Sequence, residues 1–551
     1  MLRSLSTSAV ALIVGAAPAL ADITPAQAWE NLTKYYKDFG YEVTGTVDDA
    51  GSSLTVTDAA FTFQNNPGET SITIPKISFT ETGDAKVRMV LDGDMAFSAT
   101  FEVPNPDAAA GTDSPDQDTA TDDAADPTAE DGAAGETADA DAATGTDMPT
   151  ETLEMTGTIL MPDNEMLMSG SPEDVLYEYT YPSIKLDMQI PMQEDDVVLP
   201  ATMEFTDVKG TQRNTGADET HSTFDMVASA LKITSAMDLP NQEGKFAVDL
   251  TMNGIASKGE GTAPAGEFDF GTQMAEALAA GFNFDGTLSY KDMQGTLNVE
   301  QPGTQEAPAK TVNGTFTSGA SELAFAMAEE GMGYKGHSVN TNVELNISDV
   351  PFPIRYGIQE TSADLMLPLT KGEEPQPFKF AYTLGGLTLD DAIWNLFDPQ
   401  SQLPRDPASL TVDLSGDMLV TMDLFDPALS QPQTDANGFP VAPPVPMEPK
   451  TLQVNRVALD AVGAKADVTG ELDFGDNPEQ PVGKLQGNFE GINGLLDKAV
   501  AMGFVPQDQV MGVRMMMAMF AKPVEGETDK LATEIEFREG GSIFANGQQI
   551  K

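Results

Sequence analysis

Apolar and polar residues alternate with a period of two along most of this 551-residue chain. Because successive side chains of a strand point to opposite faces, this pattern predicts strands with one apolar face and one polar face. Short stretches of Gly, Asn and Asp separate the alternating runs, as is typical of turns between antiparallel strands. The sequence therefore predicts a β-rich α+β fold of long, twisted antiparallel sheets with one buried face, braced by about four helices.

Two of the alternating runs contain an interruption. Residues 72–79 alternate on either side of Pro75-Lys76, which we interpret as a break because proline cannot donate to a strand ladder. Residues 410–424 alternate on both sides of Ser415-Gly416-Asp417, and this arrangement predicts a β-hairpin with its turn at the glycine.

The first helix is predicted at residues 24–40. Thr24 is a good N-cap, Pro25 suits the first helical position, and Gln27 completes a capping box, while Gly40 is placed to end the helix. One side of this helix is apolar and should pack on another apolar surface. The residues of that side are Trp29, Leu32, Tyr36 and Phe39.

Two further helical regions are predicted nearer the C-terminus. Thr388 is the expected N-cap of one, with Asp391 at its third position and Asp398-Pro399 at its end. Residues 495–504 and 510–520 carry apolar stripes at helical spacing, separated by Val505-Pro506, and they predict an αα-hairpin.

The first 21 residues have the pattern of a secretory signal peptide. Arg3 supplies the positive charge, residues 9–17 the apolar core, and Ala19-Leu20-Ala21 the cleavage signature before Asp22. No later run approaches the ~18 to 20 apolar residues of a transmembrane helix. We therefore expect a chain that is exported to the periplasm without a transmembrane segment.

The chain contains 87 Asp and Glu residues against 29 Lys and Arg, which gives a formal net charge of −58, and it contains no Cys. Such a charge repels phosphate groups, so direct binding to nucleic acid is excluded. Salt tolerance is the simpler explanation of the acidic composition, with cation binding as the alternative. Without Cys there is no disulfide framework, and stability must come from buried apolar area.

Two segments depart from the alternation. Residues 104–151 consist almost entirely of Asp, Ala, Thr, Gly, Pro and Glu, so we expect a disordered acidic insertion between neighbouring strands. Residues 426–450 contain seven Pro residues and predict an irregular, partly extended connection. The rest of residues 22–551 is expected to form a single elongated β-rich region.

A glycine-rich motif follows another predicted turn. Residues 323–334 alternate around Glu329-Glu330-Gly331, and residues 331–336 match the G-x-G-x-x-G fingerprint of dinucleotide-binding proteins. That fingerprint requires a helix after it, whereas residues 337–347 alternate as a strand. We therefore interpret the motif as a glycine-rich β-turn and predict neither a cofactor nor a cofactor-binding residue.

The remaining candidate groups do not form a defined site in the sequence. His221 and His337 are too few for an ordinary zinc site, and we expect both on surface strands or loops. Paired carboxylates could serve a glycosidase only at a specific separation across a cleft, which sequence cannot show. These pairs are Asp48-Asp49, Asp195-Asp196 and Asp390-Asp391. We predict no catalytic residue and no metal-binding residue.

A cluster of methionines lies in the second predicted helix of the C-terminal hairpin. Because Met fills irregular gaps in apolar interiors, we interpret the cluster as core packing. A deformable apolar surface for a lipid or a partner is one alternative, and a Cu(I) site with thioether ligands is another. The cluster consists of Met511, Met515, Met516, Met517 and Met519.

Several segments of the C-terminal half share a recognisable pattern: Asp349-Val350-Pro351-Phe352-Pro353, Leu387-Thr388-Leu389 with Trp394 through Phe397-Asp398-Pro399, Leu403-Pro404-Arg405-Asp406-Pro407, residues 410–416, and Leu495-Leu496-Asp497 through Arg514-Met515-Met516 to Asn546-Gly547-Gln548. In these segments the chain resembles the domain of unknown function 2125 family, uncharacterised exported proteins of alphaproteobacteria. The resemblance covers most of the mature chain and is clearest in residues 320–551. It implies no catalytic residue, because none is assigned in the family, and the acidic insertion departs from the family's pattern.

These observations favour a non-catalytic protein of the periplasm and cell envelope. The most specific hypothesis is a binding or scaffolding role, in which a sheet-lined groove shields an apolar ligand such as a lipid acyl chain, or in which the chain contacts another envelope protein. One-sided strands and Met-rich helices in an exported chain with few catalytic groups motivate this hypothesis. An envelope glycan hydrolase that uses paired carboxylates is one alternative, and a cell-surface structural module is the other.

Overall fold

The computed structural model describes residues 23–65, 68–104, 150–192, 197–239, 244–266, 268, 270, 273–303, 308–425, 445–475 and 477–551. Three predictions fall largely on other residues. The signal peptide, residues 105–149 of the acidic insertion and residues 426–444 of the Pro-rich connection lie outside the described residues.

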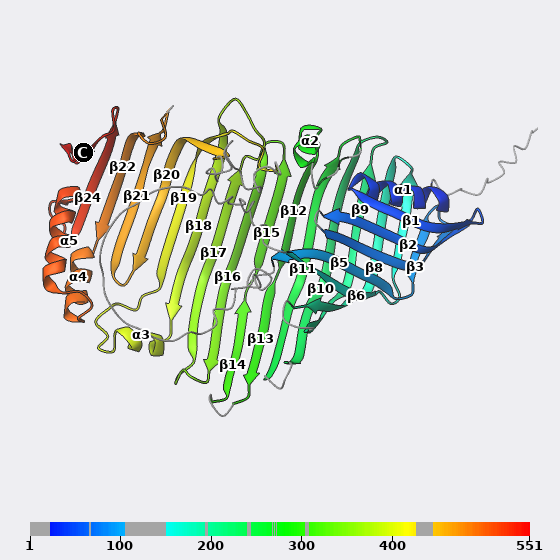
Figure 1. Ribbon diagram of the computed structural model, residues 1–551, viewed down its shortest axis with the longest axis horizontal. Helices are drawn as coiled ribbons and strands as arrows, with labels where there is room; N and C mark the ends of the chain where they lie inside the picture. Colours follow the sequence, from blue (N-terminus) through cyan, green and yellow to red (C-terminus); the bar gives the residue numbers. More distant parts are fainter. Residues whose placement is uncertain are drawn as a thin grey trace, which may run out of the picture.

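The described strands form one large sheet (Figure 1). Its first strands are β1 Tyr41–Asp49, β2 Ser53–Asn65, β3 Gly68–Glu81, β4 Val87–Asp92, β5 Met95–Pro104, β6 Thr150–Leu160, β7 Glu165–Ser171, β8 Asp174–Pro191, β9 Val198–Thr215, β10 Thr220–Leu239, β11 Gly244–Ala263, β12 Asn283–Tyr290 and β13 Asp292–Gln301. The others are β14 Lys310–Ser318, β15 Ser321–Ala328, β16 Gly331–Ile347, β17 Ile354–Leu367, β18 Gln376–Leu389, β19 Ala408–Val420, β20 Met447–Ala461, β21 Ala464–Asp473, β22 Val482–Glu490, β23 Lys522–Pro523, β24 Lys530–Arg538, β25 Ser542–Ala545 and β26 Gln548–Gln549.

The strands pair antiparallel and largely in chain order, from β1 at one end of the sheet to β24, β25 and β26 at the other. In places two short strands share the edge of one long strand: β3 pairs with both β4 and β5, and β11 pairs with both β12 and β13. The predicted β-rich α+β fold of long antiparallel sheet is confirmed.

Five helices accompany the sheet in the described part of the chain, one more than the approximate number predicted: α1 Pro25–Asp38, α2 Met274–Ala279, α3 Asp391–Phe397, α4 Ile492–Ala501 and α5 Gln507–Phe520. The capping box of α1 is confirmed, because the Thr24 hydroxyl accepts from the Gln27 N–H at 3.3 Å and the Gln27 side chain accepts from the Thr24 N–H at 3.0 Å. The αα-hairpin is confirmed as α4 and α5. The six residues of α2 are too few to produce a helical stripe in the sequence.

The cap of α3 differs from the prediction. Thr388 lies in β18, opposite Gly357 of β17, and so belongs to the sheet. Asp390 caps the helix instead, because its carboxylate accepts from the Ala392 N–H at 2.9 Å. Both residue types are good N-caps, so the choice depends on where β18 ends.

The strand register gives the sheet one apolar face and one polar face. Residues opposite each other on neighbouring strands lie on the same face. The row of paired residues that contains Phe79 continues through Met166 and Met226 to Leu288 and Leu323. The adjacent positions belong to the opposite face, where Lys379 and Asp364 form an ion pair at 2.8 Å.

The predicted break at Pro75-Lys76 is wrong, because β3 runs through it as one strand. Pro75 has no partner in β2, where Asp58 is also skipped with a positive φ of 50°, and it lies between the segments of β3 that pair with β4 and β5. The missing N–H of the proline therefore costs no ladder hydrogen bond. The irregularity instead changes which side chains face inward: Ile74 before it and Ile77 after it are both buried.

The predicted hairpin at Ser415-Gly416-Asp417 is also wrong. All three residues lie inside β19, which pairs with β18 on one side and β20 on the other. Gly416 lies between the two neighbouring strands, and a Cβ built there would be 2.1 Å from the backbone oxygen of Thr451. The glycine therefore permits a close approach of strands and does not mark a turn. The turn predicted at Glu329-Glu330-Gly331 is present, because Ala328 pairs directly with Gly331.

A helix covers the apolar face at the N-terminal end of the sheet. The ring of Trp29 in α1 lies 6.4 Å from Phe61 and 6.1 Å from Phe79, and Tyr36 lies 4.9 Å from Phe61. Phe79, Ile77 and Met168 are fully buried in this core. Figure 1 shows α1 over the first strands and the α4–α5 pair at the opposite end of the long axis.

Candidate functional site

The apolar face has exposed large side chains in its C-terminal part. The sequence predicted that this face would be buried, but over β12–β20 several of its large side chains are exposed. The exposed side chains are Leu288 (44%), Leu323 (39%), Phe325 (36%), Tyr334 (36%), Phe380 (45%) and Leu459 (48%).

The strand register arranges the apolar side chains in continuous rows. One row contains Phe325, Tyr334, Leu365, Phe380, Leu414 and Val454, one from each strand β15–β20. The next row contains Leu288, Leu323, Gly336, Ala363, Tyr382, Val412 and Val457. We call these two rows the open apolar face. At ~4.8 Å between strands, six strands extend this face over about 24 Å.

The electrostatics of the two faces differ sharply over these strands. The two rows of the open apolar face contain no charged residue. The opposite face carries ion pairs such as Arg456 with Asp467 at 2.9 Å, and His337 lies 3.8 Å from Glu360. Charges therefore keep one face hydrated, while the other offers only apolar groups and the Tyr hydroxyls to a ligand.

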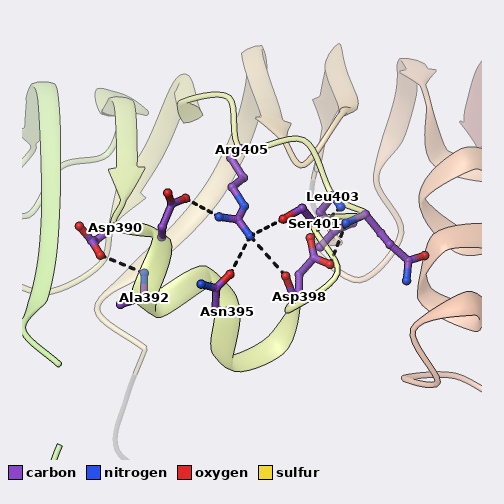
Figure 2. A network of polar contacts seen from close by, with 9 residues as sticks. Asp390, Ala392, Asn395, Asp398, Ser401, Leu403 and Arg405 are labelled. Carbon is purple, nitrogen blue, oxygen red and sulfur yellow. Dashed lines mark hydrogen bonds and ion pairs between the residues drawn. The ribbon is translucent and has the colours of Figure 1, made fainter. Parts of the chain in front are cut away.

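A polar network holds the loop that connects β18 to β19 at one end of these strands (Figure 2). The guanidinium of Arg405 lies 5.8 Å from the ring centroid of Trp394, in the geometry of a cation–π contact, and forms an ion pair with Asp391. It also donates to the side-chain amide oxygen Oδ1 of Asn395 at 3.0 Å and to the Ser401 hydroxyl at 3.0 Å.

The carboxylate of Asp398 fixes the same loop from inside. It is fully buried and accepts from the backbone N–H groups of Gln402 and Leu403, both at 2.8 Å. Burial alone would raise its pKa, but these two hydrogen bonds, with Arg405 and Lys498 nearby, lower the pKa below its ordinary value. A carboxylate satisfied in this way orders a loop and is poorly suited to act as a general acid.

The groups that the sequence offered as catalytic or cofactor-binding candidates lie in different parts of the structure and do not form one site. Residues 331–336 form the first part of β16, so no helix N-terminus follows the glycines to hold a pyrophosphate. His221 lies in β10 and His337 in β16, both on strands as predicted. Within the described ranges, no three His, Cys, Asp or Glu side chains are grouped to hold a metal ion.

The paired carboxylates are separated in the same way. Asp48 and Asp49 are exposed at the end of β1, while Asp390 caps α3 and Asp391 pairs with Arg405. The pair at positions 195 and 196 lies outside the described residues.

A cavity of about 890 Å³ among the N-terminal strands is lined by charged side chains together with apolar ones. Arg88 and Glu165 form an ion pair there at 3.2 Å, and the Ser183 hydroxyl donates to Glu204 at 3.1 Å. These carboxylates are already engaged by protein partners. The residues that line the cavity lie between positions 88 and 204, so it is separate from the open apolar face of β12–β20.

The core-packing interpretation of the methionine cluster is wrong. Met511, Met515, Met516 and Met519 are 57–69% exposed. Val510 is the buried residue of α5. The alternative of an exposed, deformable apolar surface agrees with the structure. Sequence spacing could not separate the two, because a helix buried by its own protein and one with a free apolar side have the same periodicity.

One family of known sequences matches the part of the chain that contains most of these features. Residues 296–544 match the model of a family described as an uncharacterized protein conserved in bacteria, DUF2125. This match covers less than half of the chain and is narrower than the resemblance suggested. No curated protein and no solved structure matches the chain significantly. The DUF2125 match begins within β13 and ends within β25, so it contains most of the open apolar face, the Arg405 network and the α4–α5 hairpin.

Proposed function

We propose that this protein binds an apolar chain, such as the acyl chain of a lipid, along the open apolar face, and that it does so in the cell envelope without performing chemistry. The observation that carries the proposal is the combination of large exposed apolar side chains with the absence of charge in the two rows. Large contiguous patches of exposed apolar surface are typical of sites that bind a ligand, a partner or a membrane.

Length and energy support an extended ligand. The face extends over about 24 Å, whereas one leaflet of a bilayer, half of the ~30 Å hydrocarbon core, is about 15 Å thick. An acyl chain therefore fits across the strands. Covering a half-exposed Leu or Phe contributes about 1 kcal/mol, so several such contacts act together against the cost of association.

Export is part of the proposal and has its own test. Residues 1–21 have the pattern of a cleaved signal peptide. The acidic composition is compatible with export, because salt outside the cell screens the carboxylates from one another. N-terminal sequencing of protein isolated from the periplasm should give a chain that begins at Asp22. No helix of the described residues is both long and apolar enough to cross a membrane.

The glycan hydrolase alternative gains no support from the carboxyl groups of the described residues. General acid catalysis by a carboxyl group near neutral pH needs a raised pKa. Where the pKa of a carboxyl group in the described part of the chain is shifted, hydrogen bonds lower it. The donors are side chains for Asp174, Asp187 and Glu344 and backbone N–H groups for Asp398.

Binding of a fluorescent fatty acid to the purified full chain tests the proposal. We expect Phe380→Glu to weaken binding roughly tenfold, because it places a charge in the middle of the open apolar face. Met366→Glu is the matched control: Met366 is 37% exposed, pairs with Lys379 and lies on the polar face of the neighbouring strand. Equal affinity of the two variants, or no binding by the unmodified chain, would contradict the proposal.

A further inference from the structure

The α4–α5 hairpin presents a second uncovered apolar surface, separate from the two rows of the sheet. Phe504 is 57% exposed and Met515 is 69% exposed, and the exposed fractions of Met511, Met516 and Met519 are 57–62%. All of them belong to α5 or to the turn that precedes it. Contacts of the hairpin with the sheet are made to β21 and β24.

Polar contacts fix the orientation of the hairpin. The Asp529 carboxylate accepts from the N–H groups of Asn493 at 3.1 Å and Gly494 at 2.9 Å, so it holds the first turn of α4. Arg514 of α5 donates to the Asn493 carbonyl at 3.1 Å and pairs with Asp497 at 2.7 Å, which ties the two helices together. The methionines are therefore displayed by an anchored element, at one extremity of the molecule (Figure 1).

The charge of the hairpin differs from that of the rest of the chain. Within residues 492–520, Lys498 and Arg514 balance Asp497 and Asp508, which gives a net charge of zero, whereas the whole chain carries −58. The hairpin is thus a neutral apolar surface on a strongly acidic protein. A second copy of the chain would bring another −58 to it and be repelled, and an acidic partner would meet the same repulsion.

We propose that the α4–α5 hairpin docks the protein on the surface of a phospholipid bilayer, with the exposed methionines and Phe504 inserted among the lipids. At 1.5 Å per residue the 14 residues of α5 extend over about 21 Å. This is too short to cross ~30 Å of hydrocarbon, so the helix lies in the interface. Because residues 492–520 carry no net charge, docking does not require anionic lipids.

This inference rests on the proposed function for its purpose, since a bilayer is a source of acyl chains for the open apolar face. Docking itself is independent of acyl-chain binding. The two can therefore fail separately.

Flotation of the full chain with phosphatidylcholine vesicles tests the docking. We expect the unmodified chain to float and the double variant Met515→Glu, Met519→Glu to partition at least about tenfold more weakly. Because both side chains are exposed, thermal unfolding should change little. The matched control is the double variant Leu396→Glu, Met366→Glu, which adds the same two charges at exposed apolar residues outside the hairpin and should float like the unmodified chain.

The possible results distinguish a phospholipid bilayer from a second copy of the chain as the partner of the hairpin. Failure of the unmodified chain to float, or equal flotation of the double variant, overturns the inference, as does a dimer in sedimentation that the double variant dissociates. Docking that appears only with anionic vesicles and disappears with salt also overturns it. Retained fatty-acid binding without flotation would overturn the docking alone, whereas flotation without fatty-acid binding would overturn the proposed function alone.

Discussion

Phe79 and Phe380 come from alternating strands of the same sheet and lie on the same face. Phe79 is fully buried under α1, whereas Phe380 is 45% exposed. The N-terminal region thus has a second layer over its apolar side chains, and the C-terminal region presents equivalent side chains without one in the described residues. Alternation specifies that a strand has an apolar face, but a separate element must supply the cover. Where that cover is missing, the same pattern that builds a core builds a binding surface.

Truncation of the two phenylalanines should show the largest difference between the regions. Phe79→Ala removes a buried ring and should lower the free energy of unfolding by about 3–5 kcal/mol. Phe380→Ala removes a ring that is already half in water and should cost less than about 1 kcal/mol. Urea unfolding of both variants measures the difference. Similar losses would mean that Phe380 is covered in solution.

A substitution at Gly416 should give an intermediate effect. Gly416→Ala places a Cβ 2.1 Å from the backbone oxygen of Thr451 and should destabilise the C-terminal region by about 1–3 kcal/mol. If residues 415–417 formed an exposed turn, as their composition suggests, the alanine would change stability little. Urea unfolding monitored by the fluorescence of Trp394 distinguishes the two.

The smallest expected difference between the two regions is in how their stability depends on pH. Burial between α1 and the sheet raises the pKa of Tyr36 from 10.0 to about 12, and burial also raises the pKa of Tyr177. A raised pKa adds stability below the ordinary value, which is lost as the pH rises above 10 towards 12. The N-terminal region should therefore weaken first in alkali.

In acid the larger loss is expected in the C-terminal region. The lowered carboxyl groups of the N-terminal region, such as Asp174 and Asp187, belong to exposed side-chain pairs that solvent screens, whereas two carboxylates of the C-terminal region hold backbone N–H groups. Burial alone would raise the pKa of Asp529, but its hydrogen bonds from Gly494 and Asn493 lower it overall, as they do for Asp398 with its own partners. A lowered carboxyl pKa adds stability above about pH 4, which is lost as the pH falls through the folded value.

The two tryptophans of the chain report the regions separately. Trp29 lies in α1 and Trp394 in α3, so the single-tryptophan variants Trp394→Phe and Trp29→Phe give one probe for each region. Loss of both signals at the same pH, in acid and in alkali alike, would show that the regions do not differ in this way.

The strands and the capping of α1 could be predicted because they depend on local pattern. Thr24, Pro25 and Gln27 act within one turn, and alternation is a property of each strand alone. The errors arose where distant strands decide. Pro75 is accommodated by the gap between β4 and β5, and Gly416 by the approach of β20, neither of which is visible in the local sequence.

The candidate site could be predicted only in outline. One-sided strands and Met-rich helices suggested an apolar ligand, but the exposure of Phe380 and Met515 depends on which elements pack over them. Trp394 and Arg405 stood in the sequence as parts of a family pattern. Their stacking and the burial of Asp398 emerge only when the loop from β18 to β19 folds back on α3.

Photo-crosslinking of the full chain with a diazirine-labelled fatty acid tests most directly that the open apolar face is the binding surface. Mass spectrometry of the digested protein locates each adduct. We expect adducts on Leu323, Phe325 and Phe380, with none on Met366 of the polar face or on Phe79 of the covered core. Adducts spread evenly over both faces, or concentrated in the N-terminal region, would contradict the account.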